Sequence, residues 1–145
     1  MHLRQKIREK FVEALTGLST TGSHIEASRI YSIDNVILPC LSVYCGAEEY
    51  LEDSIQKGYK GLVNMDLHID INVEGNSNFD DQLDEVLSEI QIAMSSERSN
   101  KQEGSLAMST VRFMYQGCDE PEFKEGERIQ ASMRVNYLVQ YEQNL

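Results

Sequence analysis

Three residues in the middle of the chain are of types that could do chemistry together. Asp66, His68 and Asp70 occupy every second position, so in a β-strand their side chains would project from one face. Two carboxylates and an imidazole at this spacing could converge on a hard or borderline cation, or act as an acid–base pair. The alternative is that they form the solvated side of a strand, paired across the sheet with Arg128 or Arg134. We favour the solvated face, because alternating polar positions occur in any sheet that has one buried side.

The sequence has no other pattern typical of a catalytic, metal or cofactor site. It lacks a GxSxG nucleophile motif, a phosphate-binding loop, a dinucleotide-binding glycine fingerprint and an HExxH pair. Cys40, Cys45 and Cys118 have neither a CxxC nor a Cys/His metal-binding spacing, which predicts reduced thiols in or near the core. The pattern favours a structural or interaction protein without a cofactor over an enzyme.

Length and composition predict one domain over residues 1–145. A chain of 145 residues with 41% hydrophobic and 26% charged residues has the composition of one globular domain. Residues 1–10 lack the apolar core of a signal peptide, and no apolar run approaches the roughly 18 residues of a membrane span. We therefore expect a cytoplasmic protein with no membrane partner.

The charge is strongly negative and unevenly distributed. A net charge of −11 argues against ordinary nucleic-acid binding, which depends on Lys and Arg neutralising phosphates. Residues 1–18 are nevertheless basic, with four cations against two carboxylates. These residues are Arg4, Lys6, Arg8, Lys10, Glu9 and Glu13. A basic helix on an acidic body favours head-to-tail contact between copies, the alternative being a solvated helix face.

The elements that would position these residues follow from hydrophobic periodicity. From Val63 to Glu74 apolar and polar residues alternate without a break, which predicts a long strand with one buried face. After the turn at 75–78 the apolar residues recur with a helical period. This helical stripe consists of Phe79, Leu83, Val86, Leu87, Ile90 and Met94.

The remaining segments give a first helix, four further strands and polar connections. Helical spacing runs from Leu3 to Leu18, with Gly17 where a helix commonly ends, and the strands are predicted over 25–31, 38–44, 106–115 and 127–141. Pro39 cannot donate to a ladder, so its strand begins there or lies at an edge. The connections are 46–58, 95–104 and 116–126, and the first is long enough to be functional or mobile.

These elements predict an α+β fold in the order α-β-β-β-α-β-β. Hairpin-length links favour a two-layer arrangement, with a mixed or mainly antiparallel sheet and both helices on one face. The second face of the sheet would then stay polar and uncovered. Sheet edges and long loops are the usual places for such a protein to meet a neighbour.

Several stretches of the chain resemble the tail terminator proteins of long-tailed bacteriophages, the minor tail protein U family. They are MHLRQKIREKFVEALTGLSTTG, SRIYSIDNVILPCLSVYC, GLVNMDLHIDINVEG, DDQLDEVLSEIQIAM and ERIQASMRVNYLVQYE. The similarity covers nearly the whole chain. It lies in the order of elements and in short apolar phrases such as SRIY and LPCLSVY.

The resemblance implies a non-enzymatic protein that forms a hexameric ring at the head-proximal end of a finished tail tube. The ring would stop tube growth and offer the surface to which the head attaches through its connector protein. DNA would pass through the channel without specific binding, and the acidic charge agrees with such passage. The implied location is the host cytoplasm during assembly and then the virion tail.

The surfaces expected to join copies or partners combine the basic helix, the acidic connections and the polar strand face. The candidates are Arg4, Arg8, Glu48, Glu49, Asp53, Asp66, His68, Asp70, Asp119, Glu120, Arg128 and Arg134. Carboxylates clustered at such a contact are compatible with a divalent cation that aids assembly. Two alternatives stay open: a tail-completion or tube protein that shares the fold, and a small metal-dependent enzyme built on Asp66, His68 and Asp70.

Overall fold

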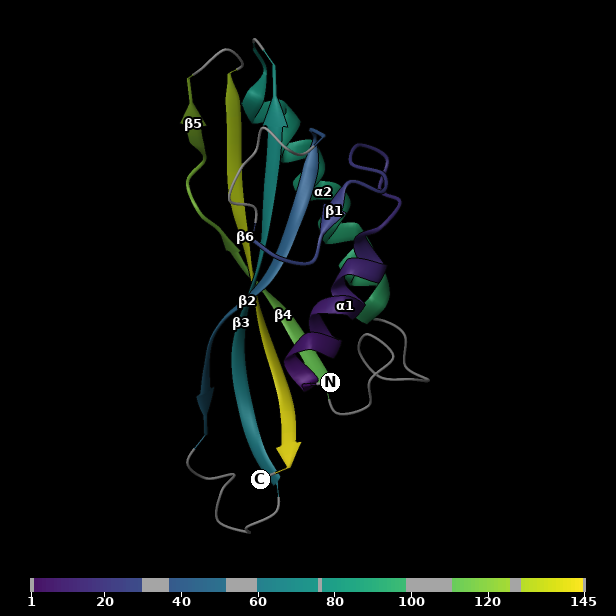
Figure 1. Cartoon of the computed structure of the whole chain (residues 1–145), viewed down its shortest axis with the longest axis vertical. Coiled ribbons are helices and arrows are strands. Elements are labelled where there is room, and N and C mark those ends of the chain that lie inside the picture. The colour runs from purple at the N-terminus through teal and green to yellow at the C-terminus, as the bar shows by residue number, and fades with distance from the viewer. Residues whose placement is uncertain are drawn as a thin grey trace.

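The computed structural model describes residues 2–29, 37–51, 60–75, 77–98, 111–125 and 129–144. Within these residues, two helices and six strands follow one another (Figure 1). They are α1 (Leu3–Leu15), β1 (Ile25–Glu26), β2 (Cys40–Tyr50), β3 (Lys60–Glu74), α2 (Phe79–Arg98), β4 (Val111–Cys118), β5 (Glu122–Lys124) and β6 (Gln130–Asn144). The predicted α+β class and order are confirmed, with the short strand β5 as an addition.

The strands form one mixed sheet with β3 near its centre. The order is β1-β2-β3-β6-β4, and β5 pairs with β6 beyond the end of β4. β1 is parallel to β2, whereas the other pairings are antiparallel. Ile69 in β3 lies opposite Val43 in β2 and Val135 in β6. Residues opposite one another project from the same face, so this register gives the three strands a common apolar side.

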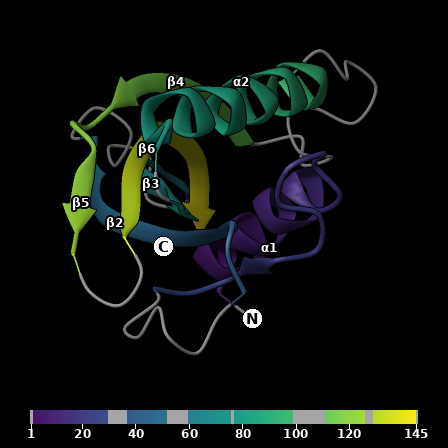
Figure 2. The same cartoon turned by 90° about the horizontal axis from the view of Figure 1, so that it is seen from above.

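Both helices pack on this apolar side. Ile7, Phe11 and Leu15 of α1 belong to the same buried cluster as the inward residues of the sheet. The cluster also contains the α2 residues Leu83, Val86, Ile90 and Met94. Figure 2 shows α2 across the top of the view and α1 at its right, with β5 at the left. The two-layer prediction is therefore confirmed.

The start and the end of α1 have local causes. The His2 Nδ1 atom accepts a hydrogen bond of 3.0 Å from the Arg4 backbone N–H, which caps the helix. Gly17 lies two residues past the last helical residue with φ +91, a left-handed conformation that costs glycine little. Its N–H donates to the Gly22 carbonyl at 2.8 Å. The chain therefore turns back towards β1.

Several predicted boundaries were wrong, because tertiary pairing extends elements into polar sequence. β2 continues to Tyr50, so the start of the predicted 46–58 connection is strand paired with β3. α2 continues to Arg98, inside the predicted 95–104 link, and the 116–126 segment contains the end of β4 and all of β5. The register of β2 against β3 shifts between Cys45 and Glu48, so apolar and polar residues do not alternate regularly there and the sequence does not show that the strand continues. Residues 52–59 and 99–110 lie outside the described part of the chain.

The central strand should dominate stability. Ile69 is fully buried, so we expect Ile69→Ala to lower the free energy of unfolding by about 2–5 kcal/mol, because it removes apolar contact and leaves a cavity. Ile37 is 66% exposed, and Ile37→Ala should change stability by less than about 0.5 kcal/mol. Urea unfolding followed by circular dichroism measures both values. Equal effects at the two positions would contradict the assigned core.

Candidate functional site

The second face of the sheet carries polar side chains from β2, β3 and β6 that bond to one another. We call this surface the polar face. Its members across the three strands are Ser42, Tyr44, Asn64, Asp66, His68, Asp70, Asn72, Ser132, Arg134, Asn136 and Gln140. The strand register sets these residues in rows, so each β3 residue has a partner on β6. One example is the 3.1 Å bond from Gln140 Nε2 to Asn64 Oδ1.

Asp70 is the centre of a charged cluster on this face. Its Oδ1 atom accepts from Arg134 Nε at 3.0 Å, and its Oδ2 atom accepts from the Tyr44 hydroxyl at 2.9 Å. The guanidinium carbons of Arg29 and Arg134 lie 4.9 and 5.6 Å from the centroid of the Tyr44 ring. Both carboxylate oxygens are thus engaged. The predicted cross-strand pairing of the acidic strand with Arg134 is confirmed.

The pKa values in this cluster follow from its geometry. Burial, together with the adjacent Asp70 carboxylate, raises the pKa of Tyr44 to about 12, because both disfavour a phenolate. The hydrogen bond to Asp70 raises the pKa of Arg134 above its ordinary value. Tyr44 therefore remains a hydrogen-bond donor and Arg134 a cation. Neither group is placed to act as an acid–base catalyst near neutral pH.

His68 belongs to a second chain of contacts. Its Nδ1 atom lies 2.7 Å from Asn136 Oδ1, and Asn136 Nδ2 donates to Asp119 Oδ1 at 2.9 Å. Because the Asn136 oxygen can only accept, the Nδ1 atom of His68 carries the proton. The imidazole ring also lies 5.4 Å from the Tyr44 ring, centroid to centroid. His68 is thus oriented by neighbours and links β3 to the acidic segment after β4.

Gly46 lies against His68 at the irregular part of β2. A Cβ atom at position 46 would come within 2.7 Å of His68 Nε2 and 3.2 Å of Asp66 Cβ. Real Cβ atoms are not found at the shorter distance, so only glycine lets β2 approach the imidazole this closely. Gly46 was not among the predicted site residues. Its position between Cys45 and Ala47 gave no sequence signal of this contact.

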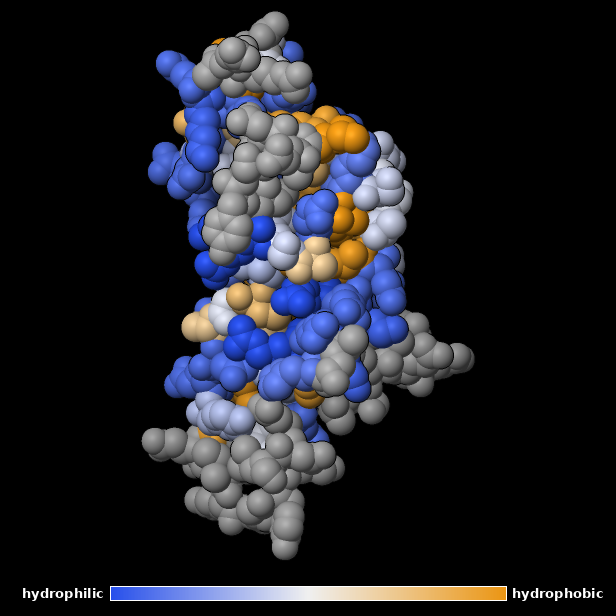
Figure 3. Space-filling model, in the orientation of Figure 1, coloured by the Kyte–Doolittle hydropathy of each residue, from blue (hydrophilic) through white to orange (hydrophobic). Residues whose placement is uncertain are grey.

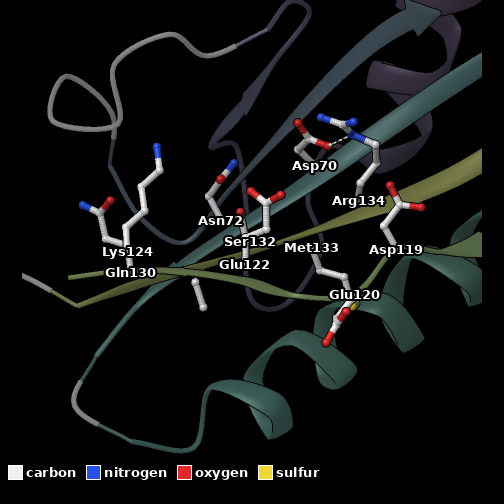
Figure 4. A pocket seen from close by; sticks show the side chains of 11 residues that line it. Asp70, Asn72, Asp119, Glu120, Glu122, Lys124, Gln130, Ser132, Met133 and Arg134 are labelled. Atoms are coloured by element: carbon white, nitrogen blue, oxygen red, sulfur yellow. Dashed lines mark hydrogen bonds and ion pairs between the residues drawn. The ribbon is translucent and has the colours of Figure 1, made fainter.

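A hollow of about 190 Å³ lies beside the cluster, between the polar face and β5 (Figure 4). Its charged lining residues are Asp70, Asp119, Glu120, Glu122, Lys124 and Arg134. The Asp70–Arg134 pair is drawn at one side of the hollow and Lys124 at the other. The mixture of signs describes a hydrated polar recess. It differs from the dry enclosed pocket that a buried catalytic acid would need.

The metal interpretation of Asp66, His68 and Asp70 gains no support. Within the described residues, no group of three or more His, Cys, Asp or Glu side chains is placed to hold a metal ion. Asp70 is bound to Arg134 and Tyr44, and His68 is bound to Asn136. The three residues do share one face, as their spacing predicted, but the sheet directs two of them to different partners.

The cysteines are free thiols, as predicted. Burial raises the pKa of Cys40 to about 11, and burial also raises the pKa of Cys45. Both thiols are therefore protonated and unreactive at neutral pH. Cys118 is exposed at the end of β4, so the expectation of a thiol in or near the core was wrong for this residue.

Arg4 and Glu48 meet each other within one chain. Arg4 Nη1 lies 3.2 Å from Glu48 Oε2, and Arg4 Nη2 donates to the Gly46 carbonyl at 2.9 Å. The Tyr141 hydroxyl donates to the same glutamate oxygen at 2.8 Å. This network fastens the first turn of α1 to the irregular part of β2 and to β6. The two residues predicted to join neighbouring copies thus hold the helix on its own sheet.

The other predicted contact residues are scattered over the surface. Glu49, Asp66, Asp119, Glu120 and Arg134 are exposed, whereas Arg8 is half-buried. Asp119 and Glu120 lie together between β4 and β5, next to the polar face. Asp53 and Arg128 lie outside the described residues.

The polar face is not wholly uncovered, in contrast to the prediction. Ser42 and Tyr44 are buried, because the chain after β1 folds over them. The Ser42 hydroxyl donates to the Ser28 carbonyl, and Arg29 lies over the Tyr44 ring. The β2 end of the face is therefore covered by peptide. Figure 3 shows mainly hydrophilic residues over the lower half of the described surface.

Comparison with known proteins assigns no family. A scan of the chain against models of protein families gives no match, and a search of curated proteins gives none. Among the described residues, neither helix has the length and apolar character needed to span a membrane.

The Gly46 contact makes a testable steric prediction. Gly46→Ala should destabilise the protein by about 1–3 kcal/mol, because the new methyl group displaces the imidazole and its strand. In a His68→Ala background the same substitution should cost much less, since the closest atom has been removed. Urea unfolding of the four variants gives the coupling energy. A coupling near zero would show that Gly46 and His68 do not touch.

Alkaline titration should expose the role of Tyr44. Its pKa is raised from 10.0 to about 12 in the folded chain. The stability that the Tyr44 hydroxyl contributes is therefore fully present below about pH 10, and it is lost as pH rises through the folded-state pKa of about 12. Tyr44→Phe should cost about 1–2 kcal/mol near pH 8 through the lost bond to Asp70, and the difference from the wild type should shrink by about pH 11. A constant difference in unfolding free energy across this range would contradict the assignment.

Proposed function

We propose that this chain is a bacteriophage assembly protein of the tail-terminator kind. Six copies form a ring on the end of the tail tube, stop its growth and present the surface that the head connector binds. The chain acts in the host cytoplasm during assembly and afterwards in the virion tail. It performs no catalysis, and DNA passes through the ring without specific contact.

The observation that carries this proposal is the polar face. The titratable side chains at its centre are bonded to one another: Asp70 to Arg134 and Tyr44, and His68 through Asn136 to Asp119. Such satisfied networks fix the shape of a surface, whereas a catalytic centre would hold a group ready for proton transfer. A rigid hydrated face of this kind suits the lining of a channel.

The net charge of the chain also supports a ring through which DNA passes. A net charge of −11 on a 145-residue chain repels the phosphates of DNA, so a ring of such subunits would let DNA slide. The acidic segment between β4 and β5, with Asp119 and Glu120, borders the polar face. Arg134 is the one lysine or arginine among the polar-face members named above, and it is already paired with Asp70.

Both helices occupy the other face, so assembly must use the edges of the sheet, the outer sides of the helices or the connections. Subunits of a ring meet through two different surfaces, because each contact is heterologous. The alternative of a metal-dependent enzyme on Asp66, His68 and Asp70 is favoured by no observation in the described residues. A tube or tail-completion protein with the same fold is distinguished by its assembly behaviour.

Electron microscopy of mixtures with tail tubes tests the proposal. We expect a ring-shaped density at one end of each tube, and growth of tubes from added tube protein should stop once the chain has bound. Pre-incubation of the tube subunits without the chain is the control, and their tubes should keep lengthening.

Two results would contradict the proposal. One is the absence of any end-bound ring together with unimpeded tube growth. The other is unlimited polymerisation of the purified chain into tubes of its own, which would identify it as a tube protein. A monomer in free solution would not by itself decide the matter, because a ring can close on the tube.

A further inference from the structure

The hollow between the polar face and β5 contains a buried amide that has no partner. Asn72 lines this hollow and is only 5% exposed, and its Nδ2 atom is buried without a hydrogen-bond partner. The residue opposite it on β2 is Cys40, and a thiol is only a weak acceptor. A buried N–H without an acceptor is costly. Asn72 therefore needs an acceptor oxygen from outside the chain.

The strand register places side chains of both charges around Asn72. Asn72 lies opposite Ser132 of β6, which in turn lies opposite Glu122 of β5. Lys124 is two residues further along β5, so it projects from the same face as Glu122. Figure 4 shows Asn72 between Lys124 and the Asp70–Arg134 pair, with its amide pointing away from the sheet on the side that these residues share. The amide is thus aimed into the hollow.

Two of the charged groups in the lining are free to bind a ligand. Glu122 and Lys124 are exposed, and within the described residues neither makes a hydrogen bond or an ion pair. Two residues of a strand span about 6–7 Å, so a free carboxylate and a free ammonium lie about that far apart. The opposite wall is fixed, because Asp70 and Arg134 bond to each other.

This lining restricts the chemistry of a ligand. An anion alone could accept from Asn72 and Lys124, but it would meet four carboxylates against two cations. A cation alone could bind Glu122, but an ammonium has no acceptor for the amide N–H. A neutral polyol would leave both free charges without a counter-charge. A molecule that joins a carboxylate to an ammonium through a short carbon chain meets all these requirements.

We propose that the hollow is a binding site for a small zwitterion of the amino-acid class. The ligand carboxylate accepts from Asn72 Nδ2 and from the Lys124 ammonium, and the ligand ammonium lies against Glu122. The hollow of about 190 Å³ has room for about six water molecules, which matches a ligand of this size. The inference goes beyond the proposed ring and does not rest on it.

NMR of the isotope-labelled full-length chain tests the site. Titration with γ-aminobutyrate should shift the side-chain amide signal of Asn72 to saturation. Butyrate lacks the ammonium and propylammonium lacks the carboxylate, so each should bind at least about tenfold more weakly. Equal binding by either of them would overturn the proposal, because it would reveal a site for a single charge. An Asn72 signal that moves with none of the three would also overturn it, and would show a hollow that holds water alone.

Variants of exposed residues test the two charged contacts without a risk to folding. Lys124→Gln and Glu122→Gln should each weaken the binding of γ-aminobutyrate by about two- to fivefold in calorimetry, as expected for exposed ion pairs. Arg112 and Glu49 are exposed in a row of the polar face that does not line the hollow. Arg112→Gln and Glu49→Gln are therefore the matched controls, and both should leave binding unchanged. Equal losses in the two pairs would overturn the site.

The amide contact has its own test. Asn72→Ala should weaken binding by about tenfold or more, because it removes a hydrogen bond to a charged group. Circular dichroism of the variant shows whether it is folded. A folded Asn72→Ala chain that binds γ-aminobutyrate as tightly as the wild type would overturn the proposal. If this variant does not fold, the Lys124 and Glu122 variants decide the outcome.

Discussion

The unbroken alternation of β3 is the constraint on which the rest of the structure depends. Every second residue from Val63 to Val73 is buried, and the intervening residues form the polar face. β3 is flanked by β2 and β6, so its register decides which side of both neighbours is apolar. A slip of one residue would send all of its apolar side chains into water, which makes the register strongly specified. Both helices then have only one surface on which to bury their stripes.

This one-sided arrangement leaves the polar face to be stabilised by its own hydrogen bonds. Cross-strand pairs such as Asp70–Arg134 contribute modestly, about 0.2–1 kcal/mol each, so their main effect is to fix the positions of the side chains. Gly46 extends this control, since the absence of a Cβ lets β2 lie close to His68. The same irregular part of β2 receives Arg4 from α1. The polar and apolar sides are therefore tied together where β2 loses its regular register.

The distribution of charge connects this architecture to the proposed assembly. The basic residues of the first segment lie on α1, whereas α2 is acidic, and the two helices contact each other on one face of the sheet. Arg4 is engaged with Glu48 of its own chain, so the cations that can meet a neighbour lie further along α1. Unlike charges on the two helices suit heterologous contacts between the copies of the proposed ring.

The sequence by itself determined the period of each long element, and with it the α+β class, the element order and the shared face of Asp66, His68 and Asp70. It left the partner of the acidic strand open between Arg128 and Arg134. These features follow from local alternation, which directs side chains to one face whatever the partner. Only the tertiary structure decided the extension of β2, the contacts of Ser42 with Ser28 and of Tyr44 with Arg29, the engagement of Arg4 with Glu48, and the approach of Gly46 to His68. Each of these contacts joins residues distant in the chain or interrupts a regular pattern. Their geometry is therefore fixed by packing, which local periodicity does not encode.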